Sequence, residues 1–200
     1  MTGSGPDTVI DLGSRQEYRL SGAGGQGLQL AAVVLADAAT AAGREVVQTQ
    51  SYGPEARGGA SRSEVIVADS QIDFPEFASP DVTLCLSQAA FETFAAATRR
   101  GGLVVYDSGL VEATQPHGIE TFGAPFTTIA KEEAGTKMAA NIVSLAALTR
   151  LTGVLGREEL LDAVRRRMPE RLVEANLRAF AAGWEVASTE AGPAAKATGS

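Results

Sequence analysis

Two glycine-rich segments carry the residue types with which this chain could bind a ligand. The first, Ser21-Gly-Ala-Gly-Gly-Gln-Gly, contains a Gly-x-Gly-x-x-Gly pattern at Gly22, Gly24 and Gly27. Glycines at this spacing let the backbone turn tightly and approach a phosphate, and the N–H groups of a following helix supply positive potential. The same glycines also allow a helix to pack closely on a strand. The pattern therefore indicates either an anion site or a purely structural turn.

The second segment is Tyr52-Gly-Pro-Glu-Ala-Arg-Gly-Gly-Ala-Ser. Its proline and glycines favour an irregular backbone that presents Glu55 and Arg57 at its centre. A loop after the second strand of an α/β sheet lies at the carboxyl edge, which would bring it beside the first glycine segment. An arginine held there suits capture of a phosphate or carboxylate by two parallel hydrogen bonds. The alternatives are that Arg57 pairs with Glu55 or contacts a partner subunit.

The elements that would position these loops follow from residue patterns. We expect an α/β fold, with a Rossmann-like, mainly parallel sheet and a C-terminal helical set packed on it. The opening is a predicted β–α–β unit, with a strand at 18–20, an alanine- and leucine-rich helix at 28–42 closed by Gly43, and a strand at 45–50. Further strands are predicted at 63–68, 81–87, 103–106 and 126–130, and helices at 88–100, 137–151, 157–168 and 169–183. We expect both apolar helices, 28–42 and 137–151, to be buried on most sides.

Composition sets the domain limits and excludes several classes of protein. Of 200 residues, the first 17 read as a flexible leader, 18–185 as a single α/β domain and 186–200 as a disordered tail. A net charge of −7 argues against nucleic-acid binding. The sequence contains neither a membrane-spanning stretch nor a signal peptide, so we expect a cytoplasmic protein.

The sequence contains few side chains that indicate redox chemistry or a metal site. The single cysteine, Cys85, lies in an apolar run and is expected to be a buried strand residue; alone it cannot form a disulfide or an iron–sulfur site. The single histidine, His117, has no supporting carboxylate cluster, so we assign no catalytic residue and no metal site. NAD binding would require an acidic residue at the end of the second strand, whereas Glu45 precedes that strand.

The two segments together resemble the gamma subunit of 2-oxoacid:ferredoxin oxidoreductases. Lys137-Met-Ala-Ala-Asn-Ile-Val-Ser-Leu-Ala-Ala-Leu is similar to that family's asparagine-containing helix, although Ala146 stands where the family often has glycine. Glu174-Ala-Asn-Leu-Arg-Ala-Phe is similar to its closing helix. The resemblance covers residues 18–184. The continuation Arg57-Gly-Gly-Ala-Ser looks more like the 2-oxoglutarate type than the pyruvate type.

The resemblance implies a subunit that is inactive alone and that helps to bind coenzyme A. Thiamine diphosphate, magnesium and iron–sulfur clusters are then expected only in the partners, which are the alpha and beta subunits, a ferredoxin-like subunit and ferredoxin. The chain itself lacks the Gly-Asp-Gly…Asn pattern of a thiamine site. The predicted coenzyme A-binding residues are Gly22, Gly24, Gly25, Gln26, Gly27, Tyr52, Glu55, Arg57, Gly58 and Gly59.

Two other classes of function stay open at this point. One is an independent nucleotide enzyme, either an NAD oxidoreductase or an adenylating enzyme. The other is a purely structural subunit whose glycine loops only dock partners.

Overall fold

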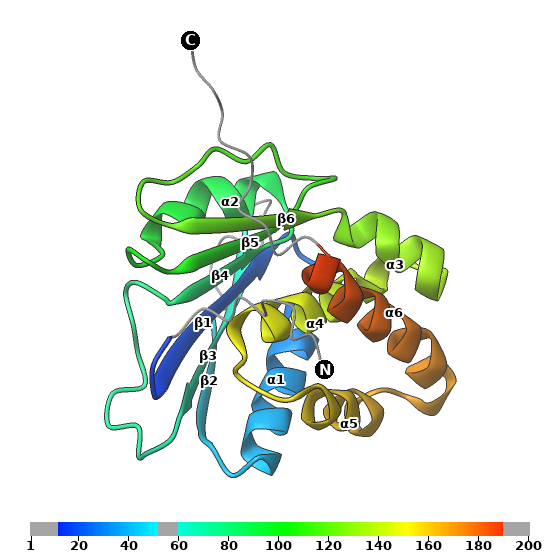
Figure 1. The fold of residues 1–200 in the computed structure, drawn as a ribbon, viewed down its shortest axis with the longest axis horizontal. Coiled ribbons are helices and arrows are strands. Elements are labelled where there is room, and N and C mark those ends of the chain that lie inside the picture. The colour runs from blue at the N-terminus through cyan, green and yellow to red at the C-terminus, as the bar shows by residue number, and fades with distance from the viewer. Residues whose placement is uncertain (1–11, 52–59, 190–200) are drawn as a thin grey trace, which may run out of the picture.

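The computed structural model describes residues 12–51 and 60–189, which build a six-stranded sheet with helices on both faces (Figure 1). The strands lie in the order β2-β3-β1-β4-β5-β6. Their bounds are Arg15–Gly22 for β1, Glu45–Ser51 for β2, Ser61–Ala68 for β3, Val82–Cys85 for β4, Leu103–Asp107 for β5 and Glu120–Ala124 for β6.

The sheet is mainly parallel, as the sequence predicts. β1, β4, β5 and β6 pair in parallel, whereas β3 lies antiparallel between β1 and β2. β2 therefore runs in the same direction as β1 but is not its neighbour. In the predicted β–α–β unit at the start of the chain, β3 lies between the two parallel strands. The carboxyl ends of β1 and β2 still lie at one edge, because Gly22 pairs with Ser61 and Ser51 with Arg62.

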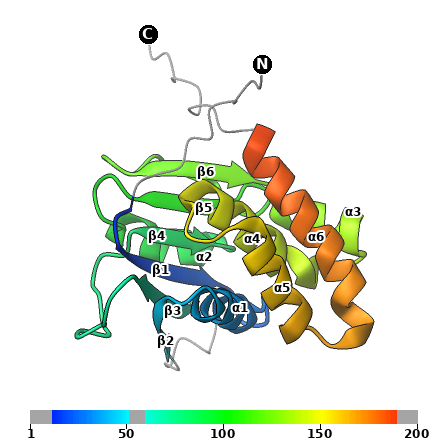
Figure 2. The same ribbon diagram turned by 60° about the horizontal axis from the view of Figure 1, so that its bottom comes forward.

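The helices divide unequally between the two faces (Figure 2). α1 and α4 cover one face; α5 packs on α1, and α6 packs on α4 and α3. α2 covers the other face against β1 and β4. The helix bounds are Leu28–Ala41 for α1, Gln88–Phe94 for α2, Phe126–Ala134 for α3, Ala140–Thr152 for α4, Arg157–Arg167 for α5 and Glu170–Thr189 for α6, with short 3-10 turns η2 at Ala95–Ala97 and η3 at Lys137–Ala139.

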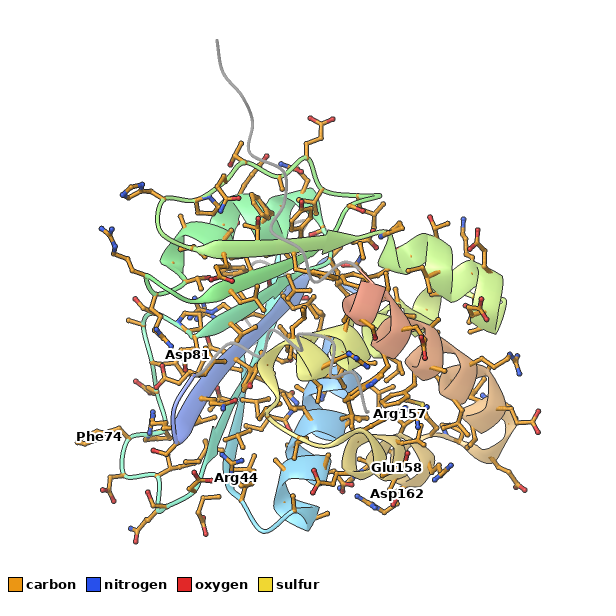
Figure 3. The ribbon with its side chains drawn as sticks, viewed as in Figure 1. Arg44, Phe74, Asp81, Arg157, Glu158 and Asp162 are labelled. Atoms are coloured by element: carbon orange, nitrogen blue, oxygen red, sulfur yellow. The ribbon has the colours of Figure 1, made fainter. Side chains whose placement is uncertain are left out.

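The two apolar helices differ in how much of their surface this chain covers. α4 buries every residue except the half-buried Arg150, which agrees with its nearly continuous apolar sequence. α1 buries one face only and leaves Gln29 and Thr40 exposed. By contrast, α5 is amphipathic and turns Glu158 and Asp162 toward solvent (Figure 3). Within the described ranges, no helix is both long and apolar enough to cross a membrane.

Several predicted elements are wrong or end elsewhere. The segment 126–130, predicted as a strand, begins α3, and the strand that precedes it, β6, was not predicted. The helix predicted at 88–100 ends as α2 at Phe94 and continues as η2. β1 starts at Arg15, inside the predicted leader, and α6 runs to Thr189, past the predicted start of the tail at 186.

Candidate anion-binding site

The first glycine segment forms the loop between β1 and α1, as its pattern predicts. Its first half is tied to β4 by the side chain of Gln26, whose Nε2 donates to the Leu86 carbonyl at 2.8 Å and whose Oε1 accepts from the Ala23 N–H at 2.6 Å. A Cβ added at Gly22 would lie 2.4 Å from Gln26 Oε1, so any larger residue there would displace the Gln26 amide. Gln26 thus serves to hold the loop together.

The middle of the loop is open. Ala23, Gly24 and Gly25 are exposed, and a Cβ added at Gly24 or Gly25 would meet no atom within 4 Å. Gly25 has a φ of 85°, which disfavours any other residue there, whereas Gly24 lies outside this left-handed region. Neither close packing nor a positive φ requires glycine at position 24, and the space next to it is open.

The end of the loop is held from a distant part of the chain. Gly27 has a φ of 75°, and its carbonyl accepts a hydrogen bond from Asn141 Nδ2 of α4 at 3.0 Å. A Cβ at Gly27 would lie 2.5 Å from that nitrogen. Both backbone strain and the close approach of α4 therefore require glycine at this position.

The start of α1 carries the electrostatic features of an anion site. No side chain caps this end of the helix, and its first turn contains no acidic residue. Among the described residues, the N–H groups of Gly24, Gly25 and Gly27 meet no hydrogen-bond acceptor. Such groups at the positive end of a helix dipole favour a phosphate or carboxylate.

The second glycine segment falls largely outside the described residues, and Tyr52, Glu55, Arg57, Gly58 and Gly59 are all among those not described. Its two flanks are described. β2 ends at Ser51 and β3 begins at Ser61, whose hydroxyl donates to the Gly22 carbonyl at 3.2 Å. Both flanks therefore adjoin the first glycine loop at the carboxyl edge.

The described arginines nearest these flanks are engaged in other contacts. Arg62 lies 3.6 Å from Glu64 and stacks over the Phe94 ring at 5.6 Å from its centroid. Arg19 is buried and pairs with Glu64 at 2.7 Å. The buried Arg19 guanidinium is therefore committed to Glu64, whereas the partly exposed Arg62 is held only by a long ion pair.

The remaining candidates for chemistry have structural surroundings. Cys85 is fully buried on β4; burial raises the pKa of its thiol to about 12, against a smaller opposing effect of the Ser21 hydroxyl. His117 lies exposed in a turn. In the part of the chain that the structure describes, no three His, Cys, Asp or Glu side chains are grouped to hold a metal ion.

The sequence identifies Asn141 only as part of the asparagine-containing helix and does not predict that it belongs to the site. The sequence placed it on a helix, but nothing in local spacing links it to Gly27, which lies 114 residues earlier. The acidic residue required for NAD is also missing from the described end of β2, because Glu45 occupies the opposite end of that strand. The described end of β2 therefore offers no carboxylate for a ribose.

These features define a mixed α/β domain with an open, anion-type glycine loop at the carboxyl edge of its sheet. Residues 17–186 match the family described as pyruvate ferredoxin/flavodoxin oxidoreductase, and the chain belongs to this family.

Individual relatives agree with this assignment. A 2-oxoglutarate synthase subunit KorC from Methanocaldococcus jannaschii is 47% identical over 176 residues, which cover 86% of this chain and 94% of that protein. The crystal structure of a keto/oxoacid ferredoxin oxidoreductase gamma subunit from Geobacter sulfurreducens PCA superposes with a TM-score of 0.82 at 43% identity, covering 88% of this chain and 98% of that one.

A third protein shares the fold at lower identity. It is a 2-oxoglutarate:ferredoxin oxidoreductase from Magnetococcus marinus with 2-oxoglutarate, coenzyme A and succinyl-CoA bound, which has a TM-score of 0.78 at 22% identity. The match covers 92% of this chain and 32% of that one. The predicted resemblance to a gamma subunit of 2-oxoacid:ferredoxin oxidoreductases is confirmed.

Proposed function

We propose that this chain is the gamma subunit of a 2-oxoglutarate:ferredoxin oxidoreductase and contributes part of its coenzyme A site. The complex would convert 2-oxoglutarate and coenzyme A to succinyl-CoA and carbon dioxide and pass the electrons to ferredoxin, or run the reverse reaction. The observation that carries the proposal is the 47% identity to a 2-oxoglutarate synthase subunit along nearly all of that subunit's length. The Arg57-Gly-Gly-Ala-Ser continuation supports the same substrate type.

The glycine loop fits the anionic part of coenzyme A. Its open space at Gly24 and Gly25 admits a phosphate, and the N–H groups there and at the start of α1 can donate to it. Arg57, in the segment whose flanks adjoin this loop, would take a second phosphate by two parallel hydrogen bonds. In this proposal the chain binds and orients coenzyme A but performs no redox step.

The redox chemistry belongs to partner subunits in this proposal. Thiamine diphosphate with magnesium would supply the carbanion chemistry of decarboxylation, and iron–sulfur clusters would carry the electrons. The buried Cys85 thiol suits neither task, because it has no second cysteine to accompany it and no access to solvent. The alpha and beta subunits, a ferredoxin-like subunit and ferredoxin are the partners that this division of labour requires.

Calorimetric titration of coenzyme A tests the proposal, both in the isolated chain and in the assembled complex. We expect saturable binding of coenzyme A in the complex. Phosphorylated fragments of coenzyme A should compete with it, whereas pantetheine, which lacks the phosphates, should not compete. NAD serves as the control for a nucleotide enzyme. Binding of NAD in place of coenzyme A, or equal competition by pantetheine, would contradict the proposed role of the loop.

A further inference from the structure

The side chain of Asn141 makes two hydrogen bonds that leave it one orientation. Its Oδ1 accepts from the Ile142 N–H at 2.9 Å, and its Nδ2 donates to the Gly27 carbonyl at 3.0 Å. A flipped amide would oppose two donors at Ile142 and two acceptors at Gly27, so the network allows only this arrangement. The residue is 3% exposed, so water cannot readily replace either bond.

The element that carries Asn141 is closely packed on its neighbours. α4 is buried between the sheet and α6 at every residue except the half-buried Arg150. α4 and α6 pack closely, since a Cβ added at Gly183 of α6 would lie 2.1 Å from the Val143 carbonyl oxygen. The amide of Asn141 is therefore presented to the glycine loop from a fixed support rather than from another loop.

The glycine loop depends on two side-chain amides for its shape. Gln26 ties its first half to Leu86, and Asn141 ties its last residue to α4. Between these ties, no hydrogen bond within the described chain holds the N–H groups of Gly24 and Gly25, and a Cβ added at either would meet no atom within 4 Å. The direction of their N–H groups is consequently set by the two ends of the loop.

We propose that Asn141 is a positioning residue for ligand binding: by holding the Gly27 carbonyl, it fixes the N–H groups of Gly24, Gly25 and Gly27 toward a bound phosphate. The identity of the ligand rests on the proposed function, in which this loop binds coenzyme A. Pre-organised donors bind more tightly because they lose less conformational freedom on binding. Asn141 acts through the loop and does not need to touch the ligand.

The variant Asn141→Asp tests this role. It keeps the size of the side chain and the acceptor for Ile142 but removes the donor to Gly27. Asn141→Ala, which removes both bonds, serves if the aspartate variant does not fold. The matched control is Asn176→Asp, because Asn176 is also a buried helical asparagine, whose Nδ2 donates to the Leu172 carbonyl at 2.8 Å within α6.

Two readouts separate a positioning role from a merely structural one. Hydrogen exchange of the purified chain should show faster exchange at the amides of Gln26 and Ala31, whose N–H groups donate to the loop carbonyls of Ala23 and Gly27, with α4 still protected. In the assembled complex, the KM for coenzyme A should rise roughly five- to tenfold, the effect of losing about one buried hydrogen bond. The kcat and the KM for 2-oxoglutarate should change less than twofold, and Asn176→Asp should change none of these values.

The outcomes are distinguishable. Unchanged loop exchange in a folded Asn141 variant overturns the positioning role, whatever happens to coenzyme A. A parallel rise in both KM values, or an equal effect of Asn176→Asp, also overturns it. Faster loop exchange with an unchanged KM for coenzyme A would show that Asn141 fixes the loop. It would also show that coenzyme A does not bind there, which contradicts the proposed function.

Discussion

Side-chain amides, rather than charged groups, shape the described part of the site. Gln26 and Asn141 each form a hydrogen bond with the backbone of the glycine loop. The N–H groups of Gly24, Gly25 and Gly27 remain for a ligand. Positive charge must then come from outside this network. Arg19 is buried against Glu64, so the candidates are Arg57, by its position in the sequence, and the partly exposed Arg62.

Replacing Arg57 should therefore affect coenzyme A more than the 2-oxoacid. Loss of a charge-assisted hydrogen bond costs about 1.5–3 kcal/mol, which is roughly ten- to a hundredfold in affinity. We expect Arg57→Ala to raise the KM for coenzyme A by this factor in the complex, and Arg57→Lys to recover only part. Steady-state kinetics with each substrate varied in turn makes the measurement. Unchanged coenzyme A kinetics together with weaker subunit assembly would assign Arg57 to the interface.

Cys85 should be chemically inert in the folded chain. It is fully buried, and burial raises the pKa of its thiol to about 12, so the reactive thiolate is scarce at pH 8. Incubation with iodoacetamide at pH 8, followed by mass spectrometry, should show no alkylation of the native chain and complete alkylation in guanidinium chloride. Rapid labelling of the native chain would mean that β4 is more accessible than the structure indicates.

The chemistry of single residues could be predicted only where the sequence is locally informative. The burial of Cys85 follows from its apolar neighbours, and the loop glycines follow from their spacing. The hydrogen bond from Gln26 to Leu86 could not be predicted, since it joins the loop after β1 to the residue after β4, and only the fold establishes that these two strands are neighbours. The contact between Asn141 and Gly27 could not be predicted either, because it joins two segments that are 114 residues apart.

At the scale of elements, tertiary contacts override local preference in one region. The β-branched segment Phe126-Thr-Thr-Ile favours a strand by propensity, yet it begins α3. Buried Asp107 explains this, because its Oδ2 accepts from both the N–H and the hydroxyl of Thr127, at 2.8 Å and 2.6 Å. A carboxylate from β5 thus caps the helix in place of a local side chain.

Strand β6 was missed for a related reason. It contains Gly123, which weakens any strand pattern. A Cβ at Gly123 would lie 2.4 Å from the Tyr106 ring of β5, so the glycine provides room for an aromatic neighbour. Helices α4, α5 and α6 were predictable because their apolar spacing is long and regular.

The contact between α1 and α5 has a pH-dependent component. Asp37 of α1 accepts two hydrogen bonds each from Arg166 and Arg167 of α5, at 2.5–3.0 Å. Burial opposes ionisation of this carboxyl, but the hydrogen bonds from Arg167 and Arg166 outweigh it and lower its pKa below the ordinary 3.8. The ionised form therefore stabilises the fold above this ordinary pKa, and the stabilisation is lost as the pH falls through the lower, folded-state pKa.

Asp37→Asn should lower the free energy of unfolding at pH 7 by about 1–2 kcal/mol, since both arginines are half exposed. The difference from the unsubstituted chain should persist at pH 5 and shrink below pH 3.8. Urea titrations at each pH measure it. The control Asp162→Asn, which breaks an exposed pair with Arg165, should have almost no effect. An equal effect of the two substitutions would contradict a specific clamp between α1 and α5.

For the whole molecule, the sheet topology explains why the binding features gather at one edge. The antiparallel β3 starts where β1 and β2 end, so the flanks of both glycine segments meet there. The sequence indicated a carboxyl-edge site from the expected α/β fold. The insertion of β3 between β1 and β2 could not be predicted, because pairing partners depend on long-range contacts.

The isolated chain should have no oxidoreductase activity. It carries one cysteine and lacks the sequence pattern of a thiamine site. Assays with 2-oxoglutarate, coenzyme A and a viologen dye should give no turnover with the purified chain, and its visible spectrum should lack iron–sulfur absorbance. The assembled complex is the positive control. Turnover of any 2-oxoacid by the isolated chain would contradict its assignment as a subunit.

The central claim is that the open space at Gly24 holds part of coenzyme A, and Gly24→Leu tests it most directly. A Cβ there would meet no protein atom within 4 Å, so the substituted chain should fold, and its assembly is checked before binding is measured. We predict that coenzyme A binds the assembled Gly24→Leu complex at least about tenfold more weakly by calorimetry, with Gly24→Ala intermediate. Unaltered coenzyme A affinity in an assembled Gly24→Leu complex would show that the ligand lies elsewhere.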